Sequence, residues 1–158
     1  MKRLLIVLFA AASLAFSAGI ASAATSTGTV GVSASVVQAC TLATTNVAFP
    51  QYASGQAAVV NANGNVAITC GSGVPYTYTL NTGLQPSGAQ TRMTDTVSFL
   101  NYGLYSDAGY SILATNTSNP TSGTGTVQNF ILYGQVPGAQ SGLTAGAYTD
   151  TVTVSVTW

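Results

Sequence analysis

The last eleven residues of the chain, YTDTVTVSVTW, alternate between apolar and polar side chains. Val152, Val154, Val156 and Trp158 share one parity, and threonine or serine occupies the positions between them. Successive side chains of a strand point to opposite faces of a sheet, so this pattern predicts a strand with one face on a core and one in water. No window after residue 24 shows a helical period, and residues that disfavour helix dominate. The sequence therefore predicts an all-β protein.

A second alternating segment, TSTGTVGVSASVV, begins at Thr25. Its glycines and small side chains predict a pliable strand that precedes the first cysteine. One parity carries Gly28, Val30, Val32, Ala34 and Val36, and the other carries Thr27, Thr29, Gly31, Ser33 and Ser35.

Several short strands separated by turn signals predict a β-sandwich around one core. Gly71, Gly73 and Pro75 mark a tight turn between two of the strands, 64–70 and 75–81, so we expect these two to form a hairpin. Low complexity predicts a surface loop over 114–126. The other expected strands are 47–49, 57–60, 100–105 and 127–136; the expected inward residues are Val66, Ile68, Cys70, Tyr76, Tyr78, Leu80, Leu100, Tyr102, Leu104, Phe130 and Leu132.

Residues 1–23 have the layout of a secretory signal peptide. Met1-Lys2-Arg3 is basic, residues 4–20 form an apolar run, and Ala21-Ser22-Ala23 offers small residues for cleavage. The run is short and contains serines, which disfavours the alternative of a membrane-spanning helix. We expect cleavage after Ala23, with Ala24 as the alternative, and a single mature domain.

Cys40 and Cys70 are the two cysteines of the chain. In an exported protein, two cysteines most simply form one disulfide, which stabilises the fold by ~3–4 kcal/mol for a loop of moderate length. Two thiolates without a histidine are too few ligands for a zinc site. The sequence therefore predicts a structural disulfide and no metal site.

Charge is nearly absent after the leader. The charged residues there are Arg92, Asp95, Asp107 and Asp150, and the chain has no His or Glu. This composition offers no basic patch for nucleic acid and no polybasic contact for a membrane. Low net charge also provides little repulsion between copies, which suits self-association.

The same residues bear on catalysis. A glycosidase-like pair drawn from the three aspartates is one alternative. We favour the interpretation that Asp107 and Asp150 are turn or strand-edge residues. The hydroxyl side chains have no histidine or lysine to activate them, so we expect no enzyme, no catalytic residue and no cofactor. A tyrosine platform for sugar stacking is a further alternative to core packing, built from Tyr76, Tyr78, Tyr102, Tyr105 and Tyr133.

The strand count indicates an incomplete sandwich. Counting from Val47, we find roughly six strands, whereas an immunoglobulin-type sandwich has about seven. The terminal strand is then a candidate for lying beside an empty groove, which would expose the core and an unpaired edge. The segment before Cys40 could fold back into its own sandwich, or it could fill the groove of another copy by strand addition. Head-to-tail insertion does not close on itself and would produce a filament.

The stretch LNYGLYSD at 100–107 and the terminal YTDTVTVSVTW resemble the spore coat protein U family, which includes the major pilins of archaic chaperone-usher pili. The resemblance covers essentially the whole mature chain. It implies an incomplete immunoglobulin-like (pilin) β-sandwich at 38–158, completed by a donor strand from another subunit. It also implies a donor segment at 24–37. The implied donor residues are Val30, Val32, Ala34 and Val36, and the implied groove-lining residues are Val152, Val154, Val156 and Trp158.

The resemblance further implies a structural pilin, exported through the periplasm to a cell-surface fibre used for adhesion and biofilm formation. Its expected partners are other copies of itself and related pilins, a periplasmic chaperone and an outer-membrane usher, with no nucleic acid. Two alternatives stay open at this point. One is a spore or cell coat or matrix protein of the same fold, and the other is a self-complemented sugar-binding β-sandwich.

Overall fold

A computed structural model describes residues 23–158, so the predicted leader lies, except for Ala23, outside the described residues. Within this range the chain forms eight β-strands and no helix, which confirms the all-β prediction. No helix in the described range is therefore long and apolar enough to cross a membrane. Contacts divide the chain between Ser35 and Val36. Residues 23–35 contain no strand, and all their side chains are exposed.

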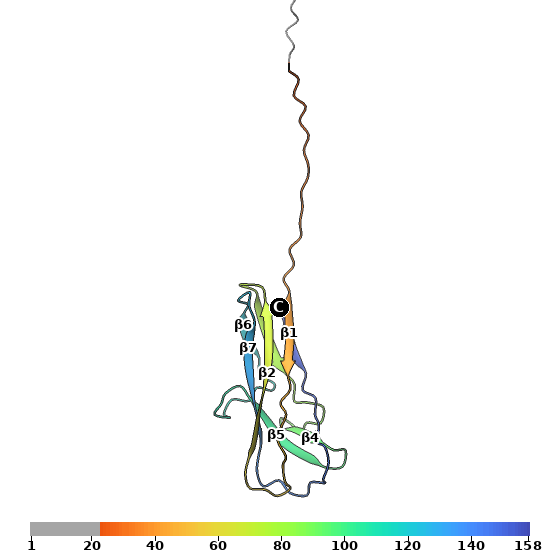
Figure 1. Cartoon of the computed structure of the whole chain (residues 1–158), viewed down its shortest axis with the longest axis vertical. Helices are drawn as coiled ribbons and strands as arrows, with labels where there is room; N and C mark the ends of the chain where they lie inside the picture. The colour runs from red at the N-terminus through yellow and green to blue at the C-terminus, as the bar shows by residue number, and fades with distance from the viewer. Residues whose placement is uncertain (1–22) are drawn as a thin grey trace, which may run out of the picture. The chain divides into compact units, whose positions relative to one another are not determined.

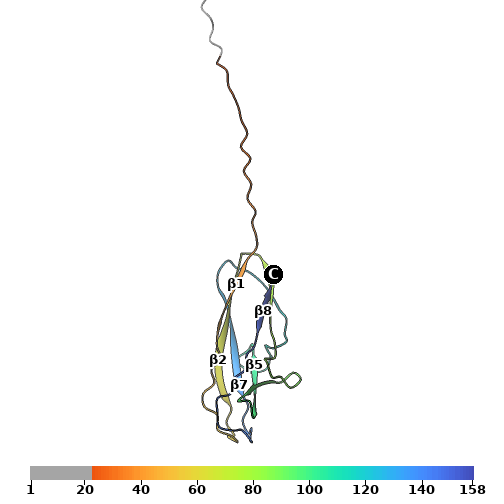
Figure 2. The same ribbon diagram turned by 90° about the vertical axis from the view of Figure 1, so that its right-hand side faces the viewer.

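The second unit, Val36–Trp158, is a sandwich of two antiparallel sheets (Figures 1 and 2). The five-stranded sheet has the order β1-β2-β7-β5-β4, and the three-stranded sheet has the order β6-β3-β8. The strands of the first sheet are β1 (Cys40–Thr45), β2 (Val60–Cys70), β7 (Gln128–Val136), β5 (Phe99–Tyr105) and β4 (Thr91–Thr94). Those of the second are β6 (Asn119–Ser122), β3 (Pro75–Leu80) and β8 (Val154–Thr157).

The core is built from the inward parity of the strands. Because alternate side chains of a strand share a face, each strand contributes a row of residues spaced two apart. The alternation predicted for β2, β3, β5 and β7 is confirmed, and Val66, Ile68 and Val136 are fully buried. The remaining buried residues of these rows are Cys70, Tyr76, Tyr78, Leu80, Leu100, Tyr102, Leu104 and Leu132, while Phe130 packs against them half-buried.

The expected hairpin between β2 and β3 is wrong. β2 pairs with β1 and β7, whereas β3 pairs with β6 and β8 in the other sheet. Both strands present large apolar side chains on one face. Two such faces are covered more completely when they oppose each other across a core than when they lie side by side in one sheet. The turn after Cys70 therefore carries the chain between sheets, and the buried Val74 packs into the core there.

Three other expectations need correction. The stretch 47–49 is not a strand, and of the expected strand 57–60 only Val60 is in one. The predicted loop 114–126 contains β6, because its residues find the free edge of β3. The alternating segment at 25–36 forms no strand, because none of the described residues pairs with it.

The predicted disulfide is confirmed. Cys40 and Cys70 are bonded, and they are also direct partners in the register of β1 on β2. The bridge therefore fixes the first residue of an edge strand to the last residue of its neighbour.

Candidate functional site

Two unpaired strand edges lie on the same side of the sandwich. β1 ends the five-stranded sheet and pairs only with β2, and β8 ends the three-stranded sheet and pairs only with β3. The end of β8 lies close to the start of β1 in both Figure 1 and Figure 2. There the indole Nε1 of Trp158 donates a hydrogen bond of 3.3 Å to the carbonyl of Gln38. Free strand edges of this kind are templates for pairing with another chain.

The backbone of the C-terminal segment has one satisfied edge and one open edge. Thr149 exchanges two hydrogen bonds with Thr94, and the carbonyl of Thr153 accepts one from the backbone of Asn81. Because alternate residues of a strand direct their N–H and C=O groups to the same neighbour, the odd-numbered residues face β3 and β4. The even-numbered residues of 148–158 therefore direct their backbone groups toward the open side.

A cavity of about 400 Å³ follows this open edge. Its floor is the core itself, formed by Leu80, Tyr102, Leu104 and Leu132. One wall is residues 44–47 and Phe49, and the other is residues 148–152 and Val154. A completed sandwich would cover these apolar side chains, because leaving them in water forfeits the free energy of burial.

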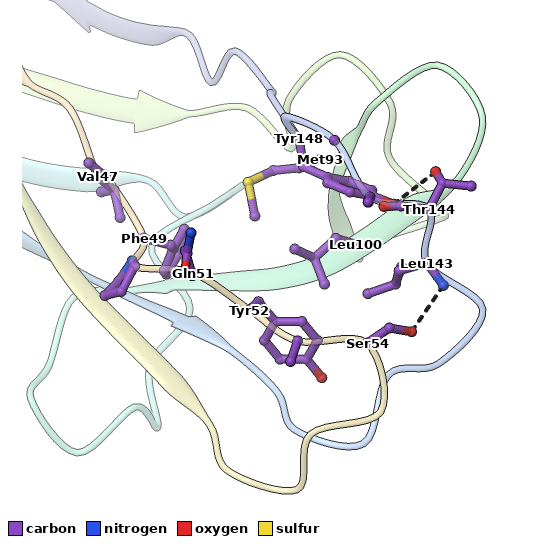
Figure 3. A pocket seen from close by; sticks show the side chains of 15 residues that line it. Val47, Phe49, Gln51, Tyr52, Ser54, Met93, Leu100, Leu143, Thr144 and Tyr148 are labelled. Carbon is purple, nitrogen blue, oxygen red and sulfur yellow. Dashed lines mark hydrogen bonds between the residues drawn. The ribbon is translucent and has the colours of Figure 1, made fainter.

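A second cavity of about 720 Å³ continues the groove toward the loops (Figure 3). Its apolar lining includes Phe49, Tyr52, Met93, Leu100 and Leu143, and it shares Val47, Phe49, Met93 and Tyr148 with the first cavity. The two cavities are therefore one elongated groove between residues 44–54 and the C-terminal segment 143–154.

Gly64 and Gly134 leave room for residues 45–49 of the groove wall to pack against the sheet. A Cβ on Gly134 would be 2.5 Å from a methyl of Val47 and 2.8 Å from the ring of Phe49. A Cβ on Gly64 would be 2.7 Å from the other methyl of Val47 and from the carbonyl of Thr45. The chain that follows β1 thus leaves the sheet edge and packs Val47 and Phe49 onto bare backbone, where they form part of the groove.

Asp150 is the one charged side chain among the inward positions of the C-terminal segment. Its carboxylate accepts a hydrogen bond of 2.6 Å from the hydroxyl of Tyr102 and one of 2.8 Å from the backbone N–H of Leu84. Burial, and then the adjacent carboxylate, raise the pKa of the Tyr102 hydroxyl, which stays protonated. The pair places a charged group beside the apolar floor of the groove.

A polar network holds the wall of the larger cavity. The carboxylate of Asp95 accepts hydrogen bonds from the backbone of Ser98 and from the hydroxyl of Thr144. The Ser98 hydroxyl also contacts that of Tyr148. The Ser98 backbone N–H, and then the Thr144 hydroxyl, hold the pKa of Asp95 well below its usual range. The network ties the loop after β4 to residues 143–148.

Asp107 lies in a turn, and the tyrosines considered for a sugar platform differ in their burial. Asp107 accepts hydrogen bonds from the backbone N–H groups of Gly109, Ser111 and Ile112, so it closes a turn as predicted. The three aspartates accept hydrogen bonds from three separate sets of residues, and residues 23–158 contain no group of three potential metal ligands. Of the tyrosines considered for a sugar platform, Tyr76, Tyr78 and Tyr102 are buried in the core, whereas Tyr105 and Tyr133 are only partly buried.

The structure places the sequence-predicted groove residues along one wall. Val152 and Val154 line the smaller cavity, Val156 is half-buried on the same face, and Trp158 is 55 % exposed at the end. The predicted donor residues lie in no strand, and Val30, Val32 and Val36 are 89 %, 91 % and 95 % exposed. Sequence reasoning missed the opposite wall, because it assigned Val47 and Phe49 to an ordinary strand and gave Tyr52 no role.

Comparison with known proteins shows the family of the chain. One solved structure with a similar fold is the pre-assembly complex of a chaperone with a tip adhesion subunit from archaic chaperone-usher Csu pili of Acinetobacter baumannii. The matched chain is 26 % identical with a TM-score of 0.61, and the match covers 78 % of this chain but only 40 % of that one. Comparison with curated proteins gives no match. The sequence profile of the Spore Coat Protein U domain matches residues 26–155, and with a groove-bearing immunoglobulin-like sandwich behind that match, the chain belongs to the Spore Coat Protein U domain family.

Proposed function

We propose that this protein is a structural subunit of a chaperone-usher pilus, polymerised by strand donation from copy to copy. The observation that carries the proposal is the open groove beside the C-terminal segment, whose inward valines are half-buried next to an unpaired backbone edge. The same chain carries an alternating segment that pairs with nothing in the described residues. The alternating segment of one copy could therefore add as a strand to the groove of another copy.

The energetics support insertion between copies. Each donor valine that moves from water into the groove contributes ~1.5–2 kcal/mol, and the backbone of both strands gains hydrogen bonds. Insertion of one copy into the next leaves a free groove at one end and a free donor at the other, so growth continues as a fibre. In this proposal residues 1–23 are the leader, 24–37 the donor segment, and 38–158 the sandwich.

The similarity to a chaperone-bound pilus subunit supports two further partners. A periplasmic chaperone would cover the groove before assembly, because an exposed core and free edges invite aggregation. An outer-membrane usher would then exchange the chaperone for the donor segment of the next copy. The product is a cell-surface fibre serving adhesion and biofilm formation.

Deletion of residues 25–36 tests the proposal. The truncated protein, expressed in the periplasm, is expected only in complex with the chaperone, and a synthetic peptide of residues 25–36 should bind it and raise its melting temperature. A truncated protein that is soluble and monomeric without any chaperone would rule out strand donation. Electron microscopy of producing cells with and without the gene distinguishes fibres from an amorphous coat, and an amorphous coat would contradict the pilus.

A further inference from the structure

Three partly exposed tyrosines gather at the end of β5, away from the groove. Tyr105 and Tyr133 are direct partners in the register of β5 on β7. Tyr110, from the loop that follows β5, stands nearly perpendicular to both, with ring centroids 5.6 Å and 6.4 Å away. We call these three residues the tyrosine cluster. Because β2 and β7 separate β5 from the free edge of β1, a strand inserted into the groove would leave the cluster uncovered.

The backbone around the tyrosine cluster supports its side chains. A Cβ on Gly103 would lie within 2.8 Å of three atoms of the Tyr105 side chain, so this ring rests on bare backbone. Tyr110 has a φ of 53°, in the left-handed region that favours glycine. A turn that served only to reverse the chain would be less strained with glycine there, so the tyrosine indicates a role for its side chain.

A cavity of about 290 Å³ adjoins the cluster at Tyr133. β5 pairs with β7 only opposite Tyr133–Gln135, so residues 128–132 of β7 have no strand partner on that side. The cavity lies along this stretch. Its apolar lining is Tyr78, Ala114, Phe130 and Leu132, and its polar lining is Ser106, Asn119 and Asn129.

Polar groups at the cavity and the cluster retain hydrogen-bonding capacity. The side-chain oxygen of Asn129 accepts a hydrogen bond of 2.9 Å from Asn65, which leaves the NH₂ group of Asn129 as a donor. The NH₂ group of Asn119 donates to the Thr117 carbonyl, which leaves the side-chain oxygen of Asn119 as an acceptor. The buried Tyr102 hydroxyl is bonded to a carboxylate, whereas no described residue hydrogen-bonds the hydroxyls of the tyrosine cluster.

Charge is nearly absent from this part of the molecule. Between Phe99 and Val136 the one charged residue is Asp107, and backbone N–H groups of its own turn donate to its carboxylate. Recognition of an ionic ligand relies on a complementary charge, which the cavity and the cluster lack. Aromatic rings and carboxamides without charge instead suit an uncharged ligand that combines apolar faces with hydroxyl groups.

We propose that the tyrosine cluster and the adjoining cavity bind an uncharged polysaccharide of the cellulose or chitin type. The sugar rings of these polymers carry their substituents equatorially, so both faces of each ring present C–H groups that pack on tyrosine rings. The equatorial hydroxyl and amide groups would meet the side chains of Asn119 and Asn129. This binding goes beyond the proposed function, and a fibre would repeat the site along its length, so that weak single contacts add up to strong attachment.

Sedimentation with cellulose and chitin particles tests the site. Assembled wild-type fibres are expected to sediment with at least one of the two, and soluble cellohexaose or chitohexaose should release them. In the double variant Tyr105→Ala/Tyr133→Ala, the apparent affinity should fall by about tenfold or more, because two stacking rings are lost. Phe99→Ala is the matched control, since Phe99 is another exposed aromatic residue of β5, 44 % exposed, and lies outside the cluster. It should bind as the wild type does.

A measurement on the unmodified protein covers the case in which the double variant does not fold. Hydrogen–deuterium exchange of wild-type fibres with the bound hexasaccharide should show protection confined to residues 103–110 and 128–135. Wild-type binding to neither polymer, an equal loss in Phe99→Ala, or protection elsewhere would overturn the site. Binding to polystyrene beads but to neither polymer would show a contact with apolar surfaces instead. A wild type that forms no fibre would contradict the proposed function, and the same assays on the chaperone-bound or free subunit would still decide the polysaccharide site.

Discussion

Residues 25–36 and residues 148–158 carry the same alternating pattern but differ in structure. The C-terminal segment pairs with Thr94 and with β3, and its valines are half-buried. The N-terminal segment forms no strand, and three of its valines are about nine-tenths exposed. Both segments alternate in the same way, although the N-terminal one has smaller side chains, so the alternation alone does not account for the difference.

The comparison teaches that alternation specifies a face but not a partner. A strand needs a neighbour that shares its backbone hydrogen bonds. The few contacts of an isolated strand do not offset the conformational entropy lost when its residues become ordered. The C-terminal segment has such a neighbour in β3. The N-terminal segment finds none among the described residues, and under the proposed function its neighbour is the groove of another copy.

A charge placed on the inward parity of the N-terminal segment should leave folding intact, whereas one on the inward parity of the C-terminal segment should impair folding. Val32→Asp leaves an exposed residue exposed, so the subunit should still fold and be recovered with its chaperone. Fibre assembly should be abolished, because insertion would bury an unpaired carboxylate at a cost of several kcal/mol. Val154→Asp should lower the yield of folded subunit itself, because that side chain already packs on the core. The measurement is the amount of chaperone-bound and fibre-bound protein.

Ser33→Asp is the matched control for the donor segment, because it lies on the opposite parity and would face solvent after insertion. Fibre yield close to the wild type is expected from it. If Ser33→Asp and Val32→Asp impaired assembly equally, the donor would not use the even-numbered face.

Loss of the disulfide should weaken the groove from the β1 side. β1 has one paired edge and the bond between Cys40 and Cys70, and its side chains after Cys40 are exposed. Replacing both cysteines with alanine should reduce the free energy of unfolding by about 3–4 kcal/mol for a loop with a sequence separation of 30. Urea denaturation of both proteins measures it. A change below about 1 kcal/mol would show that pairing with β2 alone holds β1.

An added methyl group distinguishes the packed unit from the unpaired segment. Gly134→Ala should destabilise the protein by about 1–3 kcal/mol, because its Cβ would overlap Val47 and Phe49 on the groove wall. Gly31→Ala should leave the unfolding midpoint unchanged, because no atom lies within 4 Å of the new Cβ. Thermal melts of the two variants compare them. A second substitution, Val47→Ala, should recover part of the loss in Gly134→Ala, and no recovery would mean that the wall is not seated on this glycine.

Much of the fold followed from the sequence because the signal was local. The inward rows of β2, β3, β5 and β7 were predicted from parity, and the disulfide from the count of cysteines in an exported chain. The pairing of β2 with β3 was wrong, because a short turn between two strands has the same sequence whether it folds a hairpin or crosses between sheets. Whether the turn forms a hairpin or a crossover depends on which strand faces pack against each other in the folded core.

For the same reason, one wall of the groove was predictable from the sequence and the opposite wall was not. The wall carrying Val152 and Val154 is a regular strand pattern, so its face could be read from the sequence. The opposite wall depends on Val47 and Phe49 packing over Gly64 and Gly134, which are far away in the chain. No local sequence pattern predicts a contact between a segment without regular structure and glycines of a sheet. The contact exists only once the sheet has formed.

Acid should act on one unit alone, because residues 25–36 contain no titratable side chain. Hydrogen bonds from Ser98 and Thr144 lower the pKa of Asp95 below its unfolded value of about 3.9. The stability from these bonds is therefore present above the usual carboxyl range and is lost as the pH falls through that range toward the folded pKa, because the unfolded chain takes up the proton first. Urea midpoints measured from about pH 7 to pH 2 should decline more steeply in the wild type than in Asp95→Asn. Equal slopes would mean that the hydrogen bonds of the Asp95 carboxylate do not stabilise the contact between the loop after β4 and residues 143–148.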